Sequence, residues 1–187
     1  MDSDDEMGEN HLAICYYGMQ RLDKNGKKSA VGITKAIFDE QYDIHETWKN
    51  NLSYGLPITK VIRYEAWEFI EGFPTQGFFR KYGGEDFHLM LLLNEFFEPI
   101  YANEETVKYN IYENSIVGKL LDCYKHPLSE HDETCKKNPE RFKIYKITKK
   151  IRQKIFKEQL KYLNFKFQKM GLKEKLSGLA FREKSDN

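Results

Sequence analysis

The sequence predicts a mixed fold of the α/β class that continues into a long basic helix. Short apolar runs at 31–38 and 58–63 are typical of strands, and apolar residues at helical spacing follow them. A longer periodic pattern over 144–170 indicates one extended amphipathic helix. Apolar residues make up 40% and aromatic residues 14% of the 187 positions, so the chain can bury a core. We therefore expect a folded protein.

The individual elements follow from the spacing of apolar residues and from the turn residues between them. The polar segment 48–55 is expected to be a loop, and so is the segment 77–84, which is rich in glycine and aromatic residues. The expected elements before residue 115 are, in order, a helix over 12–22, strands over 31–38 and 58–63, helices over 64–70 and 87–97, and strands over 100–102 and 107–112.

The last quarter of the chain differs from the rest in charge and periodicity. Residues 136–187 hold 17 Lys and Arg against 5 Asp and Glu, a net charge of +12, whereas the rest has 13 against 24, a net charge of −11. Asn138-Pro139 is a helix start signal, and Gly171 is a stop signal. We expect an α and β unit over 1–135 and a basic helical tail over 136–187.

Composition also indicates in which cellular compartment the protein resides. No stretch of the sequence approaches the about 18 uncharged apolar residues that a membrane span needs, and the acidic start lacks the features of a signal peptide. The three cysteines, Cys15, Cys123 and Cys135, are a poor disulfide framework because they are few and odd in number. We expect a cytoplasmic protein that the basic tail would place at the periphery of a membrane.

Two acidic segments contain side chains that can bind a metal ion or accept a proton. Asp2, Asp4, Asp5 and Glu6 crowd carboxylates into one turn, and a divalent cation such as Mg²⁺ or Mn²⁺ would relieve their repulsion and bridge a diphosphate. The alternative is a frayed, solvated and merely acidic chain end.

The second acidic segment is Gly83-Gly84-Glu85-Asp86. Its glycines let the backbone approach a ligand closely, and its carboxylates fall at a helix start. Ordinary capping of that helix by Glu85 or Asp86 is the alternative.

The order of these segments resembles that in family 2 glycosyltransferases of the GT-A fold. Asp2-Ser3-Asp4-Asp5-Glu6-Met7, followed by a helix, resembles the family's DxD segment. Gly72-Phe73 and then Gly84-Glu85-Asp86 resemble its Gly-Phe and Gly-Glu-Asp elements, and the turn at Asp23-Lys24-Asn25-Gly26-Lys27 is similar to one often found between them. The resemblance covers residues 1 to about 115 and depends on the combination, since either motif alone is weak.

The resemblance implies an inverting transfer of a sugar from a nucleotide-sugar donor to a hydroxyl acceptor, either a glycan or a lipid-linked molecule. Asp2 and Asp4 would contact the ribose and a Mn²⁺ or Mg²⁺ ion on the diphosphate, and Asp86, with Glu85 beside it, would be the general base. Trp48 and Tyr82 would stack on sugar faces of the acceptor, with packing in the core or in a loop as the alternative.

Two departures from the family pattern matter. Many relatives carry an Arg-x-His pair after the last strands, where this sequence has Asn110 and Tyr112. The family also binds its nucleotide with a βαβα half before the DxD segment, and only Met1 precedes that segment here. We therefore expect a partial GT-A-like domain that lacks this half and is inactive alone: a gene fragment, a split subunit whose partner supplies the half, or the product of an internal start.

A rival hypothesis concerns Cys123, His126, His131 and Cys135. Two thiols and two imidazoles at these short spacings can hold zinc tetrahedrally. Beside the basic tail, such a site would indicate a small zinc- or nucleic-acid-binding module. The alternative is that these are ordinary surface or half-buried residues.

The basic tail has a structural and a functional interpretation. The simplest is a helix packed by one face onto the domain, with lysines in solvent. Its functional reading is attachment to an anionic membrane surface, where lipid-linked acceptors reside. Nucleic acid is not expected as a partner, because the tail has few arginines and no recognised RNA motif.

Overall fold

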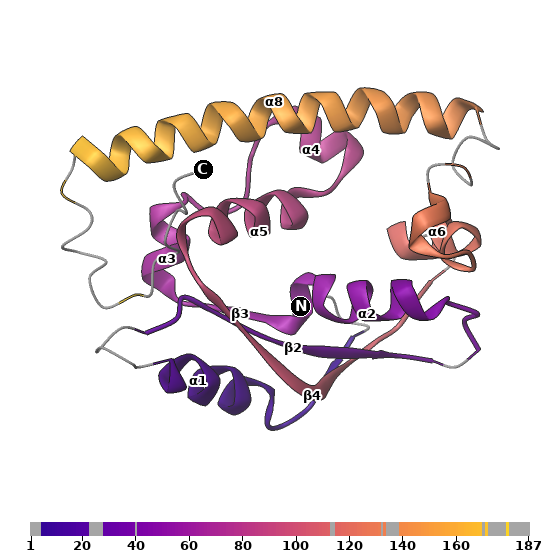
Figure 1. The fold of residues 1–187 in the computed structure, drawn as a ribbon, viewed down its shortest axis with the longest axis horizontal. Coiled ribbons are helices and arrows are strands. Elements are labelled where there is room, and N and C mark those ends of the chain that lie inside the picture. Colours follow the sequence, from indigo (N-terminus) through magenta and orange to yellow (C-terminus); the bar gives the residue numbers. More distant parts are fainter. Residues whose placement is uncertain are drawn as a thin grey trace.

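The computed structural model describes residues 5–22, 28–39, 41–112, 115–131, 133, 139–169, 171 and 179. They form an α/β fold with a curled sheet, one helix on one face of that sheet and a group of helices on the other (Figure 1). The expected α/β class is confirmed.

The sheet is mixed and contains both parallel and antiparallel pairs. Its four strands lie in the order β1-β4-β2-β3. The central strands β2 and β4 are parallel, and the outer strands β1 and β3 are antiparallel to their neighbours. Parallel neighbours need a long crossover connection, which the chain between β2 and β4 provides with helices. The strands are β1 (Glu6–Met7), β2 (Val31–Phe38), β3 (Lys60–Ile62) and β4 (Pro99–Tyr109).

Helices account for most of the remaining described residues. The α-helices are α1 (His11–Arg21), α2 (Glu46–Gly55), α3 (Tyr64–Phe69), α4 (Gly77–Tyr82), α5 (Glu85–Phe96), α6 (Ile116–Tyr124) and α8 (Pro139–Lys169), with short 3-10 turns at Pro57–Thr59 and Leu128–Glu130. Figure 1 shows α1 on the opposite side of the sheet from α2, α3 and α5, with α8 crossing above α4 and α5. None of the described helices combines the length and the apolar character that a membrane span requires.

Several expected elements are confirmed with nearly the same bounds, namely the helix after the acidic segment, the strand at 31–38, the helices at 64–70 and 87–97, and the long C-terminal helix. Four expectations were wrong in whole or in part. Of the strand expected over 58–63, only Lys60–Ile62 is a strand, and a 3-10 turn at Pro57–Thr59 precedes it. Segment 48–55 is helical rather than a loop, because the His45 side chain accepts a hydrogen bond from the Thr47 amide and caps α2 while Trp48 and Leu52 pack against the core. Residues 77–82 form the short helix α4, and the two strands expected after residue 100 are one strand, β4.

The hydrophobic core has two clusters on the helix-rich face of the sheet. The first joins α3, α5 and β2 to the C-terminal half of α8. Phe69 meets Phe96 edge to face, with ring centroids 4.9 Å apart, and Leu163 of α8 is only 2% exposed in the same cluster. The second cluster joins α2 and α6 to the later parts of β2 and β4. The long basic helix is therefore part of the first cluster along its C-terminal half, and Phe142 near its start packs against the second cluster.

Candidate functional site

The turn before α5 places two carboxylates at the start of a helix. Gly83 and Gly84 have φ angles of 66° and 82°, a left-handed backbone that side chains with a Cβ rarely adopt. This turn ends α4 and begins α5, so Glu85 and Asp86 fall in the first turn of α5. The amino end of a helix presents positive potential to negative groups there. The Asp86 Oδ1 accepts a hydrogen bond of 2.7 Å from the Phe87 amide.

Arg152 of α8 contacts this turn with its guanidinium group. Its Nη2 donates to the Gly83 carbonyl at 3.2 Å. A Cβ built on Gly84 would lie 2.9 Å from the Arg152 Cζ, which is closer than real Cβ contacts. The sequence indicated neither Arg152 nor this contact, because nothing local marks a pairing of residues about 70 positions apart.

A lysine from β3 stands beside the carboxylates. Lys60 is half-buried, and its ammonium group donates a hydrogen bond to the Leu56 carbonyl. Burial lowers the pKa of Lys60 to about 7, and the nearby Asp86 carboxylate partly offsets this by raising it. The Asp86 carboxylate at the start of α5 is thus near enough to act on the charge of a lysine from another element. Nothing in the sequence marks Lys60, which is an ordinary lysine in a strand.

His88, one turn into α5, connects the helix to α8. It is 1% exposed, its Nε2 donates a hydrogen bond to the Gln159 side chain, and its ring packs against Phe79. Burial lowers the pKa of His88 below its usual value, while the hydrogen bond to Gln159 opposes this shift. These contacts give His88 a supporting role beneath the carboxylates.

The two aromatic residues predicted to bind an acceptor lie in different surroundings. Tyr82 immediately precedes the glycine turn, is partly exposed and packs on Phe78, with ring centroids 5.2 Å apart. Trp48 of α2 packs against Tyr124 and His131, at centroid distances of 4.6 Å and 5.0 Å. Of these two residues, Tyr82 lies nearer to Asp86 in the chain, four positions before it, whereas Trp48 belongs to the edge of the second core cluster.

The acidic N-terminal segment is described only from Asp5, so Asp2 and Asp4 lie outside the described residues. The Oδ1 of Asp5 accepts a hydrogen bond of 3.3 Å from the Asn110 amide, just beyond the end of β4. Glu6 of β1 forms an ion pair of 3.3 Å with Lys108 of β4. The acidic segment therefore adjoins the end of β4, next to the stretch that replaces the family's Arg-x-His pair.

The residues proposed for metal binding can be assessed only in part. Among the described residues, no three His, Cys, Asp or Glu side chains are grouped so that they would hold a metal ion. Asp2, Asp4 and Cys135 fall outside that part of the chain. Of the other proposed zinc ligands, Cys123 is buried, His126 is exposed, and the His131 ring packs against Trp48 and Tyr145.

A buried polar cluster behind β1 was not predicted. The His11 Nδ1 lies 2.7 Å from the Thr106 Oγ1 and 3.1 Å from the Thr34 Oγ1, and the two threonine hydroxyls are 2.7 Å apart. Burial lowers the pKa of His11. The cluster attaches the start of α1 to both central strands, which supports the position of the preceding acidic segment.

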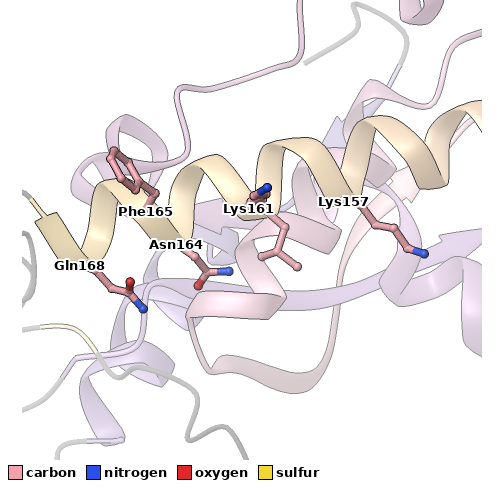
Figure 2. Close-up of a pocket in the computed structure, with 6 residues that line it drawn as sticks. Lys157, Lys161, Asn164, Phe165 and Gln168 are labelled. Carbon is pink, nitrogen blue, oxygen red and sulfur yellow. The ribbon is translucent and has the colours of Figure 1, made fainter.

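A shallow hollow on α8 is lined by residues of that helix alone, among them Lys157, Lys161, Asn164 and Phe165 (Figure 2). It is a surface feature of one helix and lies apart from the carboxylates. Comparisons with protein-family models, with curated proteins and with solved structures found no match to the chain.

Proposed function

We propose that the chain is the acceptor-side part of an inverting glycosyltransferase that uses a nucleotide-sugar donor and a hydroxyl acceptor. One observation carries the proposal. The Gly83-Gly84 turn places Glu85 and Asp86 at the amino end of α5, beside Lys60 and supported by Arg152. This arrangement presents a carboxylate with fixed surroundings to a ligand, as general base chemistry requires.

Asp86 is the proposed general base. It would accept the proton of the acceptor hydroxyl while the hydroxyl oxygen bonds to the anomeric carbon and the diphosphate leaves from the opposite side. The amino end of α5 presents positive potential to this carboxylate, which suits a negatively charged side chain, and Lys60, with its pKa lowered to about 7, adds to that potential when it is protonated. Tyr82, exposed beside the turn, would stack on the acceptor, and Trp48 is the second candidate for that contact.

The donor side is assigned to the acidic N-terminal segment. Asp2 and Asp4 would bind the ribose and a Mn²⁺ or Mg²⁺ ion, and carboxylate oxygens suit both ions. When bound, the ion would neutralise negative charge on the diphosphate. The hydrogen bond between Asp5 and Asn110 supports this assignment, because it ties the residue after Asp4 to the end of β4.

Nucleotide binding tests the donor side. Nucleoside diphosphates should bind weakly to the chain in the presence of Mn²⁺, as measured by calorimetry. EDTA and Asp4→Asn should abolish binding, whereas Asp86→Asn should leave it unchanged. If no nucleoside diphosphate binds at millimolar concentration, or if binding survives EDTA, the proposal is wrong.

Transfer assays test Asp86. If the chain transfers or hydrolyses a sugar nucleotide, alone or with an added nucleotide-binding half, Asp86→Asn should lower kcat by about 10²–10⁴-fold. Glu85→Gln, its neighbour in the same turn, is the matched control and should have a smaller effect. Equal activity of Asp86→Asn and wild type would exclude Asp86 as the base. One tightly held zinc per purified chain would instead favour the site at Cys123, His126, His131 and Cys135.

A further inference from the structure

The inner and outer sides of α8 differ in chemistry. Arg152, Gln159 and Leu163 on the inner side contact the glycine turn, His88 and the first core cluster. The outer side of α8 lies half a helical turn around from the inner side. Side chains three, four or seven positions apart in the sequence lie together along it. We define the outer face of α8 as Lys143, Ile147, Lys150, Lys154, Lys161 and Phe165, all of which are exposed.

Four lysines and two apolar side chains lie along this face, with Ile147 near its start and Phe165 near its end. Ile144 and Ile151 border it, and these two residues are 53% and 38% exposed, while Ile147 is 47% and Phe165 is 55% exposed. Large apolar side chains gathered on one surface indicate a binding site more strongly than the same residues scattered singly. Residues 139–169 hold eleven basic and two acidic residues, a net charge of +9. An occupant should therefore be both anionic and apolar.

We propose that the outer face of α8 binds the surface of an anionic lipid membrane. The helix would lie in the plane of the membrane over its length of about 46 Å, because its inner side is packed on α5. The isoleucines and Phe165 would enter the boundary between headgroups and acyl chains, while the lysines extend to the phosphates. In Figure 2, Lys157, Asn164 and Gln168 project from α8 on the side away from the Phe165 ring, and their amine and amide groups are donors for a headgroup.

Charge and apolarity together favour lipid over other occupants. A second copy of the chain would bring two lysine-rich faces together, and their repulsion would oppose dimerisation. Nucleic acid would satisfy the lysines but would bring no apolar surface to the isoleucines. The lipid surface supplies anionic phosphates and an apolar interior at the same boundary. This inference does not depend on sugar transfer, so its failure and that of the proposed function are distinguishable.

Co-sedimentation with vesicles tests whether the lysines of the outer face of α8 bind anionic lipid. The chain should pellet with vesicles of phosphatidylcholine and phosphatidylserine but not with phosphatidylcholine alone, and less as NaCl rises. The variant Lys150→Gln, Lys154→Gln, Lys161→Gln should bind on the order of a hundredfold more weakly. A control variant, Arg21→Gln, Lys28→Gln, Lys108→Gln, loses the same charge elsewhere and should bind like wild type. Equal pelleting with neutral and anionic vesicles, no pelleting with either, or equal weakening of both variants would overturn the proposal.

A second pair of variants tests the apolar residues. Ile147→Asn with Ile151→Asn should remove the binding that persists at high salt, with circular dichroism confirming that the variant is folded. Leu12→Asn with Tyr16→Asn changes two exposed residues of α1 in the same way and should leave binding unchanged. Tighter binding to RNA than to anionic vesicles, or a dimer that dissociates on the Ile147 and Ile151 substitutions, would contradict a lipid surface.

Discussion

The two halves of α8 have similar apolar spacing but different surroundings. In the first half, Ile144, Ile147 and Ile151 are exposed, although Phe142 packs against the second core cluster. In the second half, Leu163 is buried, and Phe156, Leu160 and Phe167 pack against the core formed by α3 and α5. A periodic apolar stripe in the sequence therefore does not reveal which of its residues will be covered. The neighbouring elements decide that, and the uncovered residues remain available to a partner.

Among the variants that test this comparison, Leu163→Ala should lower the free energy of unfolding the most. It removes a buried side chain from the first core cluster, so the free energy of unfolding should fall by about 2–5 kcal/mol. Ile147→Ala, on the exposed half of the same helix, should change it by less than about 0.5 kcal/mol. Urea denaturation followed by circular dichroism measures both. Similar losses for the two variants would mean that the first half of α8 is also packed.

Gly84→Ala should have the next largest effect, about 1–2 kcal/mol, because Gly84 has a left-handed backbone. The added Cβ would meet the Arg152 guanidinium, which can move aside only by weakening its hydrogen bond to the Gly83 carbonyl, so the same substitution should cost somewhat less in an Arg152→Ala background. Gly77→Ala is the control, since its added Cβ would meet nothing within 4 Å. If the cost of Gly84→Ala is independent of Arg152, α8 does not hold the turn.

Gln159→Leu tests the contact between α8 and His88. The buried His88 Nε2 would lose its acceptor, and the free energy of unfolding should fall by about 1–2 kcal/mol. Gln153→Leu makes the same change at an exposed position of α8 and should be nearly neutral. Thermal unfolding of the two variants at pH 7 makes the comparison. An equal effect at both positions would show that the contact with His88 adds nothing to stability.

Lys166→Met should have the smallest effect and a distinct pH dependence. Lys166 Nζ lies 2.8 Å from the Glu71 Oε1, and this hydrogen bond, joined by one from Tyr162, lowers the pKa of Glu71. A lowered carboxyl pKa contributes stability above the unfolded value near 4.5 that is lost as pH falls through the folded value. The variant should therefore be less stable by up to about 1 kcal/mol at pH 7, and the difference should shrink in acid to the contribution of the hydrogen bond from Lys166 to the Phe69 carbonyl. A difference that does not change with pH would exclude the ion pair as a contributor.

Local sequence was enough for the elements whose own residues specify them. The spacing of Leu89, Leu92, Leu93 and Phe96 predicts α5, because all four residues occupy its buried side. α2 was missed because its two packed residues, Trp48 and Leu52, stand among polar ones and give a weak pattern. β4 was predicted as two strands because its central residues are polar and exposed, and in the structure the pairing with β2 shifts register at this point while the strand continues.

The sequence by itself determined the glycine turn, the carboxylates at Glu85 and Asp86, and a basic helix of about the observed length. Tertiary structure alone decided that Arg152, Gln159 and Lys60 would surround that turn. It also decided which half of the apolar stripe would stay exposed. The physical reason is that propensity and turn geometry act over a few residues, whereas burial, hydrogen-bond partners and pKa shifts depend on segments that only folding brings together.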